Sequence, residues 1–270
     1  MTYRVVLLGS ILALGACRDD IKSQIDGGPD SSGDWDTSGG PDANTDARCA
    51  STGADERFSF FVTSMEALVE LSGSSTGFGG DLRYNGASTG IAGADAICQV
   101  IASRVCFGHK TWRAFLSTTS ENAIDRVGPG PWFDHDGLLV ADNPSGLTGT
   151  RPAGGNHDDY MVDELGRIHD GNSDYNNDGV NDDDHDVMTG SDTNGELDRQ
   201  RRNCNDWTSL EGSGPQCGHM WPGGPGPNWI SQHTVPECAR GINLTNRSQR
   251  EPGVGGSGGY GAFYCFAISE

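Results

Sequence analysis

Gly261-Ala262-Phe263-Tyr264-Cys265-Phe266-Ala267-Ile268, close to the C-terminus, is the stretch that decides the fold. Its aromatic and branched side chains are typical of a buried strand. A second run of this kind, Phe58-Ser59-Phe60-Phe61-Val62-Thr63, begins the regular structure. Because both end strands have a buried character, we expect them to lie side by side in a closed domain.

The chain between these two runs predicts a mixed α+β fold with long loops. A Gly-rich loop follows the first strand, and residues 93–103 then place Ile97, Val100 and Ile101 at the i, i+3, i+4 spacing of an amphipathic helix. Beyond Cys204, tryptophans stand among Gly and Pro, which indicates a loop-rich region anchored by aromatic rings. Further elements are expected at Trp112–Ser117 and Leu138–Ala141 (strands) and at Ser120–Arg126 (a short helix).

The N-terminal residues are typical of a secretory signal. Arg4 precedes a short apolar run that ends in Leu14-Gly15-Ala16-Cys17, the pattern of a bacterial lipobox. The pattern predicts removal of residues 1–16 and lipidation of Cys17. The lipid would anchor the protein to a membrane of the bacterial cell envelope, at the outer membrane or the cell surface. The alternative is an ordinary cleaved signal followed by a chance cysteine.

Residues 17–57 have the composition of a tether. Gly, Pro, Ser and Asp dominate, as in Asp26–Asp34, and apolar residues are scarce. Such a segment buries too little surface to offset its ordering entropy, so we expect a flexible acidic stalk. The folded domain then spans residues 58–270, with an Asp-rich insertion at about residues 157–198.

The charge of the chain excludes one class of partner. The 270 residues carry a formal net charge of −20, and only 34% are hydrophobic. A protein that grips nucleic acid needs a basic face, so no nucleic-acid partner is expected. Much of the negative charge lies in residues 156–198, which hold twelve Asp and two Glu against one Arg.

The Asp-rich insertion contains the sharpest local motif. Oxygen-bearing side chains alternate from Asp174 to Asp182, with Gly179 at the sixth position, as in the first half of an EF-hand loop. The twelfth position holds His185 instead of Glu. The motif predicts calcium; a solvated loop without an ion, or another cation, are the alternatives. The expected ligands are Asp174, Asn176, Asp178, the Val180 carbonyl and Asp182.

Cysteines and histidines give weaker signals. The chain has eight cysteines, and lipidation of Cys17 would leave an odd number for structural disulfides in an oxidising compartment. Cys217-Gly218-His219 alone is a weak metal motif. The sequence lacks the His-Glu-x-x-His and Gly-x-Ser-x-Gly motifs, and we do not expect an enzyme.

Several segments resemble endostatin, the C-terminal fragment of certain collagens. The resemblance runs through residues 90–99, 112–117, 189–195, 204–209 and 264–266. Residues 125–134, 218–222 and 229–231 are more similar to bacterial lipoproteins with endostatin-like domains, including the leptospiral endostatin-like outer-membrane proteins. Together these segments cover roughly residues 58–270.

The resemblance implies a C-type-lectin-like (endostatin-like) domain with disulfides Cys98–Cys265 and Cys204–Cys238. Cys106 and Cys217 would be free to form an added bridge, leaving Cys49 unpaired. The motifs of calcium-dependent sugar binding are missing: Ser191-Asp192-Thr193-Asn194 and Thr234-Val235-Pro236-Glu237 stand in their places. Nothing matches the N-terminal histidines of the endostatin zinc site.

The resemblance favours adhesion or ligand capture by a non-catalytic lipoprotein that binds an unknown extracellular protein or glycan. The alternatives are calcium-assisted glycan binding, a hydrolase acting on surface polymers, and a structural envelope protein. Buried tryptophans of a loop-rich core would explain the aromatic residues equally well. The expected contact residues are Asp206, His219, Trp221 and Trp229.

Overall fold

The computed structural model describes residues 53–269 apart from 155–160, 170–173, 175–178, 221–227 and 246–250. The signal peptide, Cys17 and the tether up to residue 52 therefore lie outside the described residues. Among the described residues, no helix combines the length and apolar character needed to cross a membrane.

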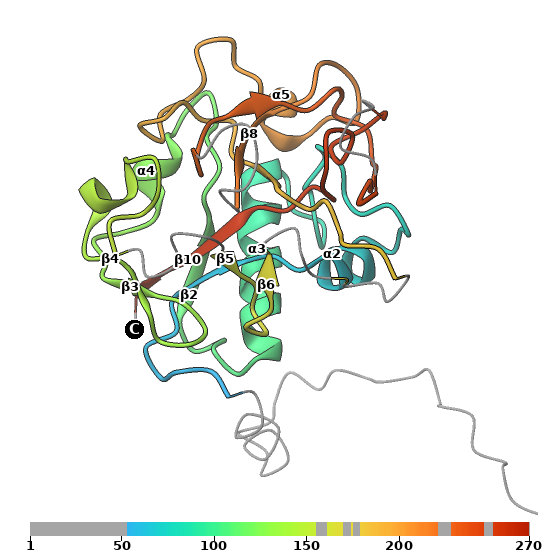
Figure 1. The fold of residues 1–270 in the computed structure, drawn as a ribbon. Helices are drawn as coiled ribbons and strands as arrows, with labels where there is room; N and C mark the ends of the chain where they lie inside the picture. The colour runs from blue at the N-terminus through green and yellow to red at the C-terminus, as the bar shows by residue number, and fades with distance from the viewer. Residues whose placement is uncertain are drawn as a thin grey trace, which may run out of the picture. The chain divides into compact units, whose positions relative to one another are not determined.

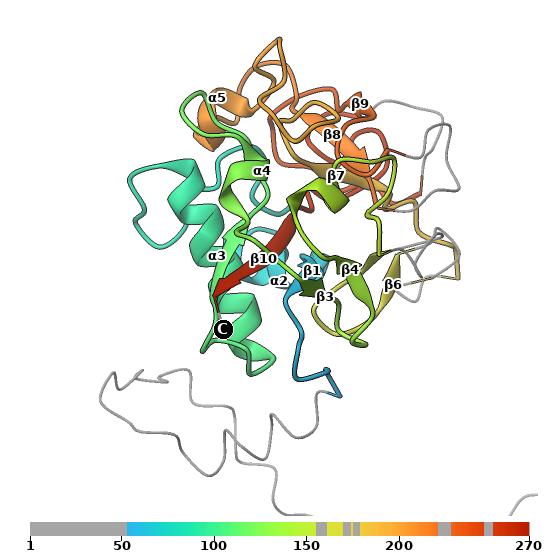
Figure 2. The ribbon, with the colours of Figure 1, turned by 90° about the vertical axis from the view of Figure 1, so that its left-hand side faces the viewer.

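The two end strands are neighbours, as the sequence predicts. Strand β10 (Tyr264–Ser269) lies between β1 (Phe60–Val62) and β2 (Thr111–Ala114), antiparallel to both. Helix α3 (Gly90–Arg104) runs beside this sheet in both ribbon views (Figures 1 and 2). Its N-cap is Thr89, whose hydroxyl accepts a hydrogen bond from the backbone N–H of Ala92.

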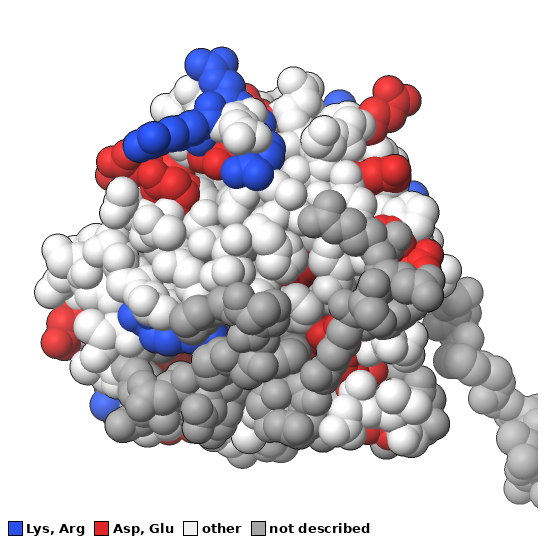
Figure 3. Space-filling model, turned by 45° about the horizontal axis from the view of Figure 1, so that its top comes forward, with Lys and Arg blue, Asp and Glu red and all other residues white. Residues whose placement is uncertain are grey.

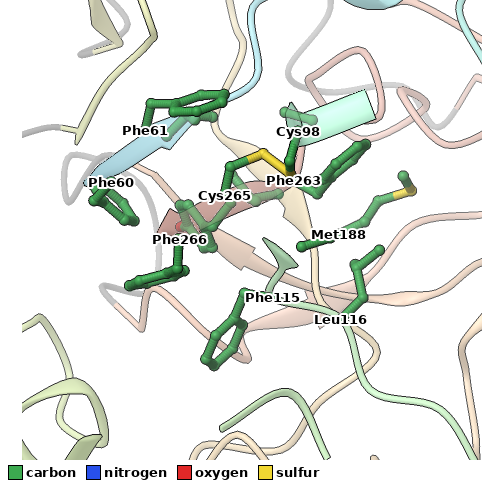
Figure 4. Packing of buried hydrophobic residues seen from close by; sticks show 14 of the residues in the cluster. Phe60, Phe61, Cys98, Phe115, Leu116, Met188, Phe263, Cys265 and Phe266 are labelled. Carbon is green, nitrogen blue, oxygen red and sulfur yellow. A yellow bond between two sulfur atoms is a disulfide. The ribbon is translucent and has the colours of Figure 1, made fainter. Parts of the chain in front are cut away.

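Both faces of β10 are covered, because successive side chains of a strand point to opposite sides. Tyr264 and Phe266 enter an aromatic cluster, in which the Phe266 ring centroid lies 4.9 Å from that of Phe60 and 5.3 Å from that of Trp132. On the other face, Cys265 forms a disulfide with Cys98 of α3 (Figure 4). This sheet is therefore the apolar centre of the domain.

Helix α2 (Met65–Ser72) corrects the expectation of a loop after the first strand. Ser64 caps it by accepting a hydrogen bond from Ala67 N–H, and Gly73 ends it in the left-handed conformation that favours glycine. The apolar stripe of this helix is short, with Ala67 and Leu68 as its buried residues. The Gly-rich composition of residues 73–80 obscured this stripe in the sequence.

A second sheet has the order β7-β8-β9, with β7 (Asp186–Met188), β8 (Gln216–His219) and β9 (His233–Thr234) all antiparallel to their neighbours. The strands and short helices that complete the described fold are α4 (Ala123–Arg126), β3 (Trp132–Phe133), β4 (Leu139–Ala141), the 3₁₀ helix η1 (Pro144–Leu147), β5 (Met161–Val162), β6 (Ile168–His169) and α5 (Cys204–Trp207). The class is mixed α+β, as predicted.

The cysteines follow the expectation in part. Cys98–Cys265 and Cys204–Cys238 are both present. Cys106 is also disulfide-bonded, whereas Cys217 is a buried free thiol. The prediction of an added disulfide between Cys106 and Cys217 is therefore wrong.

The ordered domain begins earlier than residue 58. Asp55 N–H donates to the carbonyl of His135, and the Arg57 guanidinium donates to the carbonyl of Gly137. Arg57 also pairs with Asp55 and lowers the pKa of that carboxyl to about 2. Residues 53–57, expected in the tether, thus pack against the turn at residues 134–137.

Candidate metal centre

The second sheet gathers three histidines and one aspartate from distant parts of the chain. Asp186 opens β7, and the antiparallel register places it opposite His219, the last residue of β8. His233 lies in β9, on the other side of β8. His185 immediately precedes Asp186. Their ligand atoms all lie within 4.8 Å of one another.

The three imidazoles converge on one carboxylate oxygen. The distances from Asp186 Oδ1 are 3.3 Å to His185 Nε2, 3.5 Å to His219 Nε2 and 3.0 Å to His233 Nε2. Four donors at the corners of a tetrahedron with metal–ligand bonds of 2.0–2.1 Å are separated by about 3.3 Å. The three distances from Asp186 Oδ1 lie close to this value, and all four ligand atoms lie within 4.8 Å of one another, so they could reach a single ion.

Asp186 gives the strongest indication of a cation. The residue is 2% exposed, yet neither of its carboxylate oxygens has a hydrogen-bond partner among the described residues. A buried carboxylate without hydrogen bonds is costly unless an opposite charge compensates it. A cation between Asp186 and the three imidazoles would supply that charge.

The donor types select among metals. Three imidazole nitrogens and one carboxylate oxygen form a ligand set that suits tetrahedral Zn²⁺. Calcium prefers six to eight oxygen ligands, which this group does not provide. The group therefore differs in both position and chemistry from the calcium loop that the sequence predicts.

An outer residue orients His185. Its Nδ1 lies 2.6 Å from Asp183 Oδ1, which leaves Nε2 directed toward the other donors. Gly258 makes room for this pair, since a Cβ at that position would lie 2.6 Å from His185 Cε1 and 2.8 Å from Asp183 Cγ. A carboxylate that fixes the imidazole in this way is a common partner of metal-bound histidine.

A second ionic cluster adjoins the centre through Asp184, which lies two residues before Asp186. His169 Nδ1 lies 2.6 Å from Asp184 Oδ2, and the Arg167 guanidinium donates to Asp163. Burial lowers the pKa of His169, but its contacts with Asp163 and Asp184 outweigh this effect and raise the pKa to about 9. The acidic residues here are therefore compensated within the domain.

Burial changes the interpretation of the acidic insertion. Residues 182–186 are all buried, so five consecutive ionisable side chains lie inside the domain. On the face drawn in Figure 3, the largest group of basic side chains lies at the top, and the acidic side chains form separate groups. Part of the negative charge that is concentrated in the sequence is therefore buried inside the domain.

The predicted calcium ligands are only partly described. Asp174 accepts a hydrogen bond from Gly179 N–H at 2.8 Å, Val180 is exposed and Asp182 is buried. Asn176 and Asp178 lie outside the described residues. Calcium binding by this loop stays a prediction.

Two of the four residues predicted to contact a ligand do not lie on the surface. His219 and Trp229 are fully buried, which corrects the expectation that they lie on a binding surface. Trp229 fills the core, with its indole N–H donating to the Leu147 carbonyl, and His219 belongs to the candidate metal centre. Trp221 lies outside the described residues.

Asp206 is half-buried and holds two loops together. Its carboxylate accepts hydrogen bonds from the N–H and hydroxyl of Thr119 and from the amide of Asn203. It lies in α5, where four consecutive non-glycine residues, 204–207, have positive φ angles of 51–62°. These bonds and the Cys204–Cys238 disulfide brace this left-handed turn, which is costly for such residues.

The sequence contained weak signs of the metal centre. Cys217-Gly218-His219 drew attention to His219, and His185 stood out as the wrong residue for the last position of a calcium loop. His233 carried no signal, since nothing in the sequence places β9 beside β8. No known family model matches the chain, and a search of curated proteins also finds no match.

Proposed function

We propose that this protein binds Zn²⁺ through His185, Asp186, His219 and His233. The observation that carries the proposal is the buried carboxylate of Asp186, which faces three imidazole nitrogens and accepts no hydrogen bond from the described residues. Four protein donors complete a tetrahedral shell, so the primary role is binding and not hydrolysis. The ion would join the three strands of the second sheet.

Metal analysis tests this proposal. The full chain, freed of metal with a chelator and dialysed, should take up one equivalent of zinc in a calorimetric titration. The His219→Ala variant should lose at least 100-fold in affinity, whereas His109→Ala, which removes an exposed histidine elsewhere, should not change it. Absence of zinc uptake by the folded wild-type protein would refute the proposal.

The setting of this centre is proposed to be the cell envelope, with Cys17 as the lipid anchor. The disulfides support export, because such bonds persist in oxidising compartments. Metabolic labelling with an alkyne fatty acid should mark the wild-type protein and leave Cys17→Ser unlabelled. Equal labelling of both would exclude this anchor.

A second proposed function is ligand capture by a C-type-lectin-like domain, for adhesion to an extracellular protein or glycan. It is favoured by the disulfides Cys98–Cys265 and Cys204–Cys238, which the endostatin resemblance implies. Glycan and matrix-protein arrays with and without calcium should show a specific ligand. A calcium-dependent signal would favour glycan binding assisted by the loop of Asp174 and Asp182.

A further inference from the structure

A cavity of about 600 Å³ lies beside the left-handed turn of α5 and shares no residue with the candidate metal centre. This volume is sufficient for a small molecule. Three segments of the chain line it, within residues 200–205, 211–214 and 234–238. The Cys204–Cys238 disulfide belongs to the lining and links the first segment to the third. The cavity therefore has a covalently braced wall.

The backbone of the first segment is strained where it meets the cavity. Arg201, Cys204 and Asn205 have φ angles of 55°, 51° and 56°, a left-handed conformation that is costly for residues other than glycine. Asp198 supports this conformation, because its carbonyl accepts a hydrogen bond from Arg201 N–H and its carboxylate accepts from the backbone and guanidinium of Arg202. Strained backbone that is held in this way is common where a protein clamps a ligand.

Two opposite charges line the cavity without neutralising each other. Arg202 is already held in an ion pair with Asp198. The Arg201 guanidinium and the Glu211 carboxylate, in contrast, form no hydrogen bond or ion pair with any described residue. Both residues are exposed, so their charged groups are accessible to a ligand. A ligand that complements this lining carries a negative group toward Arg201 and a positive group toward Glu211.

The rest of the lining favours a polar ligand. Its neutral hydrogen-bonding side chains are those of Gln200, Asn205, Ser213 and Thr234. The Asn205 amide nitrogen already donates to the Thr208 hydroxyl, which leaves the amide oxygen as an acceptor. Pro236 adds an apolar contact. Glu211 would repel an anion that has no positive group of its own, so the lining disfavours phosphate or a simple carboxylate.

We propose that this cavity binds the zwitterion of an α-amino acid or of a short peptide with free ends. The ligand carboxylate pairs with the Arg201 guanidinium, which suits the planar geometry of a carboxylate. The ligand ammonium group pairs with Glu211. The site is independent of zinc, and it adds a small-molecule ligand to the protein or glycan partner proposed above.

Calorimetric titration of the full chain with the dipeptide Ala-Leu tests this proposal, and saturation-transfer NMR detects binding that is too weak for calorimetry. Two blocked dipeptides, N-acetyl-Ala-Leu and Ala-Leu amide, each lack one of the two charges. Each should bind about tenfold more weakly than Ala-Leu, because one charge-assisted contact is lost. Free leucine as a further ligand distinguishes an amino acid from a peptide as the preferred zwitterion.

Two variants assign the charges to their partners. Arg201→Gln should weaken the binding of Ala-Leu about tenfold and leave that of Ala-Leu amide unchanged, because the amide has no carboxylate. Glu211→Gln should weaken Ala-Leu about tenfold and should not weaken N-acetyl-Ala-Leu, which has no ammonium group. The controls are Arg199→Gln and Glu196→Gln, which change exposed charges outside the cavity lining. Thermal melting and zinc uptake should be the same in all four variants.

Three results would overturn the proposal. If the folded wild type binds neither Ala-Leu nor leucine by either method, the cavity is not a zwitterion site, and zinc uptake by the same sample would leave the zinc proposal standing. Equal affinity for Ala-Leu and both blocked dipeptides would show that the two charges are not recognised. Unchanged affinity for Ala-Leu in both Arg201→Gln and Glu211→Gln would place the binding site elsewhere.

Discussion

The two three-stranded sheets are both antiparallel, but one buries apolar side chains and the other buries ionisable ones. The sheet β1-β10-β2 buries aromatic rings on one face and a disulfide on the other. The sheet β7-β8-β9 buries Asp186, His219 and the neighbouring His185, with three imidazole nitrogens near one carboxylate. The first needs only the hydrophobic effect and a covalent link, whereas the second requires charge compensation. We therefore expect the two sheets to respond to different perturbations.

The largest effect is expected in the first sheet. Phe266→Ala removes a fully buried ring that contacts Phe60, Phe115 and Trp132, so it should lower the free energy of unfolding by about 3–5 kcal/mol. Denaturant titration with and without zinc measures this loss, which should be the same in both conditions. A loss that appears only without metal would show that the two sheets are not independent.

Rising pH should weaken the region where Glu164, just after β5, contacts Ser64 at the N-cap of α2. Burial and the charge of Asp163 raise the pKa of Glu164 to about 7 from 4.5, although hydrogen bonds from Ser64 act in the opposite direction. A carboxyl with a raised pKa binds its proton more strongly in the folded protein. Its contribution to stability is complete below pH 4.5 and is lost as the pH rises through 7. The full loss corresponds to about 3 kcal/mol.

The raised pKa of His169, about 9 against 6.5, acts in the same sense at higher pH. This imidazolium stabilises the fold fully below pH 6.5, and the stabilisation is lost as the pH rises through 9. Unfolding curves from pH 4 to 10 should show a continuous decline, and Glu164→Gln should flatten its lower half. An unchanged slope in this variant would contradict the assignment to Glu164.

Asp186→Asn should separate stability from metal binding in the second sheet. The substitution removes a buried charge whose oxygens accept no hydrogen bond from the described residues, so the metal-free protein should gain about 1–3 kcal/mol. The zinc-dependent rise in melting temperature should vanish at the same time. Thermal melts with zinc and with chelator measure both effects, and Asp198→Asn, at an ion pair with Arg202 away from the centre, is the control. A destabilised metal-free variant would show that the carboxylate has another partner.

The smallest effect is expected at the helix that covers the first sheet. Thr89→Ala removes the N-cap hydroxyl of α3 and should cost about 1 kcal/mol, whereas Thr89→Ser should restore it. Metal affinity should not change, because α3 packs mainly against β2 of the other sheet. Denaturant midpoints of the two variants provide the measurement.

The sequence predicted those parts of the fold that local patterns encode. The aromatic runs located β1 and β10, and the spacing of Ile97 and Ile101 located α3, which extends a few residues beyond the predicted range. The resemblance to endostatin supplied the pairing of Cys98 with Cys265, which the spacing of cysteines alone leaves open. Helix α2 was missed because its short apolar stripe precedes a Gly-rich segment.

The sequence by itself thus determined the apolar sheet, since a strand that is buried on both faces needs a continuous run of large apolar residues. It also determined that the chain carries a concentrated negative charge. Only the tertiary structure decided which of these charged side chains are buried. Asp186, His219 and His233 lie far apart in the chain, and they meet because cross-strand register and the side-chain alternation of β8 bring their polar atoms to one point. No periodicity along a single chain encodes that meeting point, so the candidate metal centre became visible only in three dimensions.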